Sequence, residues 1–492
     1  MKGIYIHFGV LVTVAALLGS NEVRSSNKKE NPFHPALIIL KDIKISSKLD
    51  LEGPVLNSDA YRKLQENAQT FWDQKDYEKL DALLDQALEQ QGYNVHGKPV
   101  YSSLIYRLEE PQETRSLSNS WTQSTESTHA YLVNGIIEKN LAWDARGSGW
   151  ANTVTDEGWR LFRKGLERSE DSLEKAIKLS PRNMAAYGSL ITVGMGRGED
   201  PSVVFELFSK AKALEGPKSE ILKRTGYYLL PRWHGDAQTY AGFVIKYSSE
   251  FADTYYKFRT LFDVIGYTSR WIEQDKKVIY AHRDIVKQID TLVDGFSRLW
   301  PESDIYHYTA ANELIANRNL KDGLRLANDG LSRHPNSARL LVARGRAHTE
   351  TRKYIEAIAD LTRAVELEPV YGLAHYRLAC AYHWNESYLE ARKAFLDAIK
   401  TLPKGEEWKI ANSHRRLCFG GSATDDHEFA VKHGNEAIKA APDNGYGYYY
   451  RGYAFAEMGE LKKAKQDFIK AIQCKESLRS DIILDFEAWE TW

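Results

Sequence analysis

Prolines recur at a regular interval in the last third of this 492-residue chain. Pro335, Pro369 and Pro403 are spaced 34 residues apart, and Pro442 follows after a further 39 residues. Because proline cannot continue a helix, a fixed proline period marks the ends of repeated helical units. A period of 34 residues predicts helix–turn–helix repeats that stack on their neighbours. The sequence therefore predicts an all-α fold, an α-solenoid in which each repeat contacts only the next.

The clearest repeat spans residues 372–406. Counting Gly372 as its first position, its pattern is carried by Leu378, Ala379, Tyr382, Ala391, Phe395, Ala398 and Pro403. This pattern resembles the tetratricopeptide repeat (TPR) family, with His375 in place of the usual tryptophan at the fourth position. Weaker copies begin at residues 304, 338, 411 and 445, so five repeats are expected over 301–475. The five extra residues before Pro442 are expected in the loop near Lys404–Lys409.

The N-terminal half carries two longer motifs. The first runs from Ala142 to Phe162, and the second is Tyr228-Leu229-Leu230-Pro231-Arg232-Trp233-His234-Gly235-Asp236. Both are similar to hallmarks of the bacterial family Domain of Unknown Function 4034, over roughly residues 60–265. The resemblance implies an irregular helical-repeat domain, expected over 58–300, and it brings no catalytic assignment. Strands are expected to be scarce, with residues 36–45 as the candidate.

The ends of the chain differ from its middle. Lys2 and the apolar run Ile4–Leu18 predict a signal peptide over residues 1–20, followed by a linker over 21–57. This predicts a periplasmic or secreted protein with no membrane span in the mature chain, and an uncleaved inner-membrane anchor is the alternative. Ile482, Ile483, Phe486 and Trp489 predict an amphipathic capping helix within 476–492. The three cysteines, Cys380, Cys418 and Cys474, cannot form a disulfide framework and are interpreted as small buried residues.

The loop of the first N-terminal motif has two interpretations. Gly147 and Gly149 permit unusual backbone angles, and Thr155 is expected to cap a helix that begins at Asp156. In the structural interpretation, Arg146 is buried and rigidifies the connection. In the functional one, backbone amides and the side chains of Arg146, Arg232 and His234 bind a small anion.

No motif of enzyme chemistry is present in the sequence. His427-Glu428 is followed by His433, which is too far along a helix for a zinc-protease site. There is no GxSxG turn, no phosphate-binding P-loop and no cysteine pair with metal spacing. The chain is therefore expected to be no enzyme, with no cofactor and no metal. Its formal net charge of −1 gives no general attraction to nucleic acid.

In the TPR family, the first helix of each repeat lines a concave groove. Carried over to this chain, the groove residues are Tyr308, Asn312, Arg339, Arg346, Tyr376, His383, Trp384, Arg415, Phe419, Tyr446, Tyr449 and Tyr453. Tyrosine, tryptophan and arginine are enriched where proteins bind one another. The sequence therefore predicts an exported, non-catalytic scaffold for a protein or peptide partner. A glycan-binding or hydrolytic envelope protein and a small-anion sensor are the alternatives, and the oligomeric state stays open.

Overall fold

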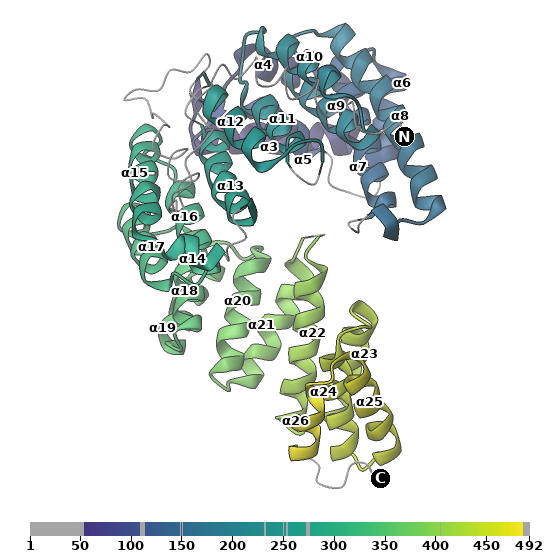
Figure 1. The fold of residues 1–492 in the computed structure, drawn as a ribbon, viewed down its shortest axis with the longest axis vertical. Helices are drawn as coiled ribbons and strands as arrows, with labels where there is room; N and C mark the ends of the chain where they lie inside the picture. The colour runs from purple at the N-terminus through teal and green to yellow at the C-terminus, as the bar shows by residue number, and fades with distance from the viewer. Residues whose placement is uncertain are drawn as a thin grey trace, which may run out of the picture. The chain divides into compact units, whose positions relative to one another are not determined.

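The computed structural model describes residues 54–485, apart from 109–113, 148, 150, 231–232, 249, 252–253, 272–275 and 404. The predicted signal peptide and the candidate strand at 36–45 therefore lie outside the described residues. The chain divides into two compact units, residues 1–306 and 307–492. Figure 1 shows that both are built from helices. The predicted domain boundaries themselves stay predictions. Within the described residues, no helix is both long and apolar enough to span a membrane.

The first unit is a succession of helices with one small sheet. Its elements are β1 (Val55–Leu56), α3 (Ser58–Gln74), α4 (Tyr77–Gln90), β2 (Tyr93–Asn94), α5 (Val100–Arg107), α6 (Thr114–Ser124), α7 (Thr128–Arg146), the 3-10 turn η1 (Ala151–Thr153), α8 (Asp156–Leu179), α9 (Met184–Arg197), α10 (Pro201–Lys212), α11 (Ser219–Tyr228), α12 (Ala237–Ser248), α13 (Tyr255–Trp271), α14 (Lys276–Ala281) and α15 (Arg283–Leu299). Strands β1 and β2 pair in parallel over two residues each. The sequence did not predict this pair, because two residues are too few for a strand pattern.

Helices α7 and α8 of the first unit pack closely against each other. A side chain at Gly135 would meet Leu173 at 2.6 Å, and one at Gly165 would meet the Ala142 Cβ at 2.7 Å. The two glycines therefore let the helix axes approach. Between them on the same interface, the buried Glu138 carboxylate accepts hydrogen bonds from Arg115 and Arg168. Two cationic side chains thus pair with this buried carboxylate.

The second unit consists of helical pairs. Its helices are α16 (Ile305–Ala316), which contains the division between the units, α17 (Leu320–Arg333), α18 (Ala338–Glu350), α19 (Tyr354–Leu367), α20 (Gly372–Trp384), α21 (Tyr388–Thr401), α22 (Glu407–Ser422), α23 (His427–Ala440), α24 (Gly445–Glu457), α25 (Leu461–Cys474) and α26 (Leu478–Asp485). The second helix of every pair has 14 residues. The repeats predicted from the proline period are thus present as helical pairs in an all-α solenoid.

The pairs pack as the repeat pattern predicts. Ala379, Ala391 and Ala398 are buried where the helices of one pair meet, and Phe395 fills the space beside them. Helix α18 also contacts α20, and α22 contacts α24, with a weaker contact between α20 and α22, whereas successive second helices touch even less within the described residues. The first helices therefore form the more tightly spaced layer, which is the inner side of a curved stack. We call the side of this layer that is turned away from the second helices the inner face.

Two details of the repeats differ from the consensus. His375, at the usual tryptophan position, is buried, and its Nε2 lies 2.8 Å from the Pro369 carbonyl oxygen. The imidazole thereby ties the helix to the preceding turn. The extra residues of the fourth repeat do not all lie in the loop near Lys404–Lys409, so that prediction is wrong in part. Helix α22 begins at Glu407 and has 16 residues, against 13 in α18, α20 and α24. Much of the insertion is an extra helical turn that carries Trp408.

Candidate binding face of the repeats

The predicted groove residues lie on the first helices, but they are not equally open. Trp384 is 51% exposed and projects from the end of α20. The side chains that are partly buried are Tyr308, Asn312, Arg339, Arg346, Arg415, Phe419, Tyr446, Tyr449 and Tyr453. Tyr376 and His383 are only 5% and 8% exposed. Which of them touch a partner stays a prediction.

Tyr376 is therefore not an open anchor on this face, which corrects the expectation from the sequence. Its ring contacts Phe395, with centroids 6.4 Å apart, and Trp408, at 6.1 Å. Its hydroxyl donates to Asn412 Oδ1 at 3.2 Å. The extra turn of α22 supplies Trp408 and covers the tyrosine. Tyr376 thus contacts two successive repeats and belongs to the packing beneath the inner face.

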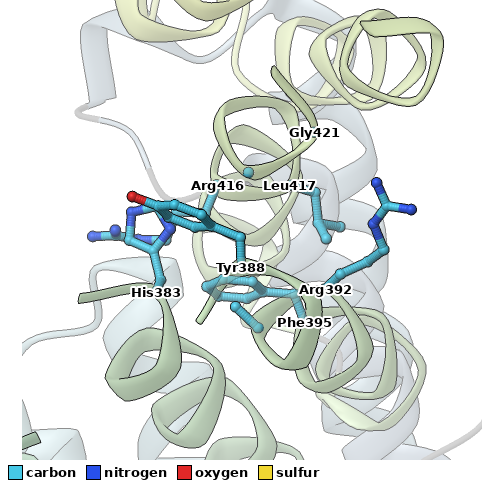
Figure 2. Close-up of a pocket in the computed structure, with 9 residues that line it drawn as sticks. His383, Tyr388, Arg392, Phe395, Arg416, Leu417 and Gly421 are labelled. Carbon is cyan, nitrogen blue, oxygen red and sulfur yellow. The ribbon is translucent and has the colours of Figure 1, made fainter. Parts of the chain in front are cut away.

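A recess opens between α20, α21 and α22 and encloses about 200 Å³ of space, part of it open to solvent. Figure 2 shows its lining, to which His383, Tyr388, Ala391, Arg392, Phe395, Arg416, Leu417, Gly420 and Gly421 contribute. His383, Tyr388 and Arg416 gather on one side, while Arg392 points to the other. Arg392 is bound elsewhere, because it pairs with Asp426 at 2.9 Å and stacks on Phe429.

His383 sits in an aromatic surround. The rings of Phe419, Trp384 and Tyr388 lie 5.3, 5.4 and 5.7 Å from its own, centroid to centroid. Burial, and then the positive charges of Arg416 and Arg415, lower the pKa of His383 to about 3. The imidazole is therefore neutral near pH 7. Its Nδ1 is buried and has no hydrogen-bond partner among the described residues.

Three partly buried arginines on the inner face have no carboxylate partner in the described part of the chain: Arg377 on α20, and Arg415 and Arg416 on α22. Each stacks on an aromatic ring. The guanidinium carbon of Arg416 lies 4.7 Å from the Trp384 ring centroid, and that of Arg415 lies 5.3 Å from Tyr446. Arg377 lies 5.7 Å from the ring of Tyr376, and its Nε is buried without a partner. Burial and the neighbouring Arg416 lower the pKa of Arg415.

The sequence analysis missed Arg377 and Arg416. Both occupy the sixth position of their repeats, whereas the positions carried over from the family were the second, fifth, ninth, twelfth and thirteenth. The sixth position lies four residues after the second and three before the ninth, so it shares their helix face. This spacing was available in the sequence. The lack of carboxylate partners could not be predicted from the sequence, because it depends on which side chains the neighbouring repeats bring close to each arginine.

Another predicted groove residue, Arg346 on α18, does have a partner. Its Nε donates to Glu350 Oε1 at 3.0 Å on the same helix, and its Nη1 lies 3.3 Å from Asn312 Oδ1. Burial and the charge of Arg377 lower the pKa of the Arg346 guanidinium. Positive charge therefore accumulates along successive first helices. Glu350 balances the charge of Arg346, whereas no carboxylate of the described residues balances that of Arg377, Arg415 or Arg416.

The glycine loop of the first unit has the geometry of a structural connection. Thr155 caps α8 as predicted, with its hydroxyl oxygen accepting from the Gly158 amide at 3.0 Å. Gly147 ends α7 with φ 73°, in the left-handed region. The Arg146 Nη1 donates to the carbonyl oxygens of Gly147 and Gly149 at 3.1 Å each. The guanidinium also lies close to the rings of Trp143 and Trp159. The loop itself therefore engages the side chain that the functional interpretation assigned to anion binding.

The two N-terminal motifs do meet, but through aromatic residues. The rings of Trp143 and Trp233 lie 5.5 Å apart, and Trp143 also packs on Phe162. The Arg146 guanidinium lies 5.6 Å from the Trp143 ring centroid. His234 stacks on Tyr228 at 4.6 Å, with its Nε2 3.4 Å from the Met195 carbonyl oxygen. Arg232 lies outside the described residues, so the predicted cluster of Arg146, Arg232 and His234 stays a prediction.

No group of three potential metal ligands occurs in the portion of the chain that the structure describes. His433 is not paired with His427. It stacks on His414 of the preceding helix instead, with their Nδ1 atoms 2.9 Å apart. All three cysteines are free, and Cys380 and Cys418 are buried, whereas Cys474 is partly exposed. Burial raises the pKa of the Cys418 thiol to about 12, which keeps this thiol protonated and unreactive.

Comparison with known proteins supports the division of the chain. The model of the family described as Domain of unknown function (DUF4034) matches residues 65–219. A model described as Tetratricopeptide repeat matches residues 308–366 and 350–406. No curated protein matches the sequence.

Several solved structures resemble part of the chain. One is MamA, at 20% identity and with a TM-score of 0.31; the match covers 35% of this chain and 96% of the MamA chain. Another is MamA from Desulfovibrio magneticus RS-1, at 16% identity, with 35% and 96% coverage and a TM-score of 0.32. A third is YrrB, described as a TPR protein with an unusual peptide-binding site, at 17% identity, with 37% and 92% coverage and a TM-score of 0.33. The chain carries an array of tetratricopeptide repeats, preceded by a region that matches the DUF4034 family.

Proposed function

We propose that this chain is an exported, non-catalytic scaffold that binds a polypeptide segment of a partner protein on the inner face of its repeats. Tetratricopeptide repeats support a role in protein–protein interaction. The observation that carries the finer proposal is the composition of the inner face, where tryptophan, tyrosine and arginine side chains from successive first helices lie together. These residue types dominate binding hot spots because they combine large apolar area with polar contacts.

Trp384 is the natural anchor on this face. It is a large aromatic side chain, half exposed, and it contacts His383 and Arg416, which line the recess between α20, α21 and α22. An exposed tryptophan beside a recess buries much apolar surface when a partner covers it. By contrast, the loop of the first unit engages the Arg146 Nη1 with two of its own carbonyl oxygens, which favours its structural interpretation over the sensor alternative.

Panning a library of displayed random peptides on the full purified chain tests the proposal. We expect peptides to be enriched, and we expect Trp384→Ala to weaken the binding of an enriched peptide at least about tenfold, a loss of about 1.4 kcal/mol. Ile355→Ala is the matched control, because Ile355 is 70% exposed on the second helix α19. Fluorescence anisotropy measures affinity and circular dichroism verifies folding.

Failure to enrich any peptide, or equal affinities for Trp384→Ala and the unaltered chain, would contradict binding on this face. Export is tested separately by fractionating cells that produce the chain with and without residues 1–20. Retention of both forms in the cytoplasm would remove the exported location from the proposal and leave the binding surface unaffected.

A further inference from the structure

The partly buried arginines of the second unit fall mainly into two groups. The larger group forms ion pairs, as Arg344 does with Asp360 and Arg451 with Asp467. The smaller group, Arg377, Arg415 and Arg416, is partly buried on neighbouring first helices and has no carboxylate partner among the described residues. Removing charge from water without a counter-charge costs free energy. An anion that binds this unbalanced, partly dehydrated cluster of positive charge therefore gains more binding free energy than it would at an ordinary protein surface.

We propose that Arg415, Arg416 and the recess beside His383 bind side-chain carboxylates of an acidic polypeptide segment, which is the class of partner that the inner face selects. This inference rests on the proposed function and names the chemistry of its ligand. The acidic segment crosses α20 and α22. One of its carboxylates lies at the mouth of the recess beside Arg416, and the others pair with the arginines around it.

The stacking of the arginines leaves them free to bind carboxylates. The guanidinium carbons of Arg416 and Arg415 lie 4.7 and 5.3 Å from the ring centroids of Trp384 and Tyr446. A guanidinium in a cation–π contact can still donate paired N–H groups to a carboxylate. Arg416 uses its Nε for Asn412 Oδ1 at 3.0 Å, so its two terminal amino groups remain unoccupied by the described residues.

The recess supplies a second contact. His383 lines it, is neutral near pH 7, and has a buried Nδ1 without a partner. A neutral imidazole can donate one N–H to an acceptor, and Arg416 lines the same recess, so the carboxylate is placed to accept from both side chains. The recess is small and part of its space is open to solvent, so an acidic side chain of a partner meets these groups at its mouth.

The same stacking argues against single-stranded nucleic acid. Proteins bind unpaired bases by offering free aromatic faces for stacking. Here guanidinium groups already lie over Trp384, Tyr446 and Tyr376. One side of each of these rings is therefore already taken by a cation, which favours a polypeptide that presents carboxylates to the guanidinium groups over a polyanion that binds through base stacking.

The test uses the full chain and the composition of the peptides enriched by panning. Displayed peptides joined through their C-termini to the coat protein carry carboxylates only on side chains. We expect enrichment of aspartate and glutamate on the unaltered chain, and loss of that enrichment on Arg416→Gln and on Arg415→Gln. Arg333→Gln is the matched control, since it removes the same charge from an exposed position on α17.

One enriched peptide is then synthesised with a fluorescent label, together with a copy in which every acidic residue is replaced by its amide. We expect the amide copy and the Arg416→Gln variant each to lose at least about tenfold in affinity, and affinity to fall as salt increases. Enriched peptides without acidic residues, or equal affinity for the amide copy, would overturn the inference while the proposed function stands. Tighter binding of a labelled oligothymidine would also overturn it. Enrichment of no peptide would overturn both.

Discussion

At the scale of single residues, the second and fifth repeats share a polar clamp that the other repeats lack. Arg344 donates to both oxygens of Asp360, at 2.6 and 2.7 Å, and to Asn328 at 3.0 Å. In the fifth repeat, the corresponding bonds join Arg451 to Asp467 and Asn435. Each arginine stands at the seventh position, where the third and fourth repeats have leucine. It connects both helices of its own repeat to the second helix of the preceding one.

Removing one partner of this clamp is expected to cost more than removing both. Asp360→Ala leaves the Arg344 guanidinium, which is about three-quarters buried, without its carboxylate, and should lower the free energy of unfolding by about 2 kcal/mol. The double variant Arg344→Leu, Asp360→Ala reproduces the Leu378–Ala394 pair of the third repeat. It should therefore recover most of that loss. Urea unfolding followed by circular dichroism measures all three proteins, and a double variant as unstable as Asp360→Ala would contradict the argument.

At the scale of elements, α26 closes the end of the repeat stack. Leu478 and Ile482 are fully buried against Phe468 and Ala471 of α25. The predicted capping helix is thus present as far as Asp485, and Phe486 and Trp489 lie outside the described residues. Without α26, the last repeat would expose its apolar side to water, which is why terminal repeats carry a cap.

Two adjacent isoleucines test this cap directly. Ile482 is fully buried and Ile483 is 45% exposed. Ile482→Ala should lower the free energy of unfolding by about 3 kcal/mol, since it removes buried methyl groups and leaves a cavity. Ile483→Ala should change it by no more than about 0.5 kcal/mol. Thermal and urea unfolding provide the measurement. Equal effects of the two substitutions would show that α26 does not close the stack as described.

At the scale of the whole molecule, buried histidines of the second unit make its stability depend on pH. Burial lowers the pKa of His383 to about 3 and that of His433 to about 4, with Arg416 and the neighbouring His414 as the largest charge contributions. Burial also lowers the pKa of His414. An unfolded histidine has a pKa of about 6.5. Between about pH 6.5 and 4 the unfolded chain therefore binds more protons than the folded one, so stability falls as pH falls through this window.

We expect the free energy of unfolding to decrease by about 1 kcal/mol per pH unit for each such histidine below about pH 6.5, and to change little from these groups between pH 7 and 8. His383→Phe retains an aromatic ring in the surround of Phe419, Trp384 and Tyr388 and removes one titrating group. Urea unfolding at pH 7, 6 and 5 should therefore show a shallower pH dependence in this variant. An unchanged slope would contradict the buried, neutral state of His383.

The sequence by itself determined the period, and with it the fold of the repeats. The interval between prolines and the small residues at Ala379, Ala391 and Ala398 depend only on local helix geometry, which one chain displays directly. The Thr155 cap was predictable for the same reason, because a cap involves residues three positions apart. The helix face of the groove residues came from the resemblance to the tetratricopeptide family.

The tertiary structure alone decided which of those residues remain open. Tyr376 is covered because an extra turn of the next repeat brings Trp408 over it, and Arg146 is occupied because its own loop folds back onto it. Arg415 and Arg416 have no carboxylate partner among the described residues, because the surrounding helices place no aspartate or glutamate side chain against them. Exposure and charge balance are properties of contacts between segments distant in the chain, so a periodic pattern identifies a helix face but not whether water or a neighbouring repeat lies against it.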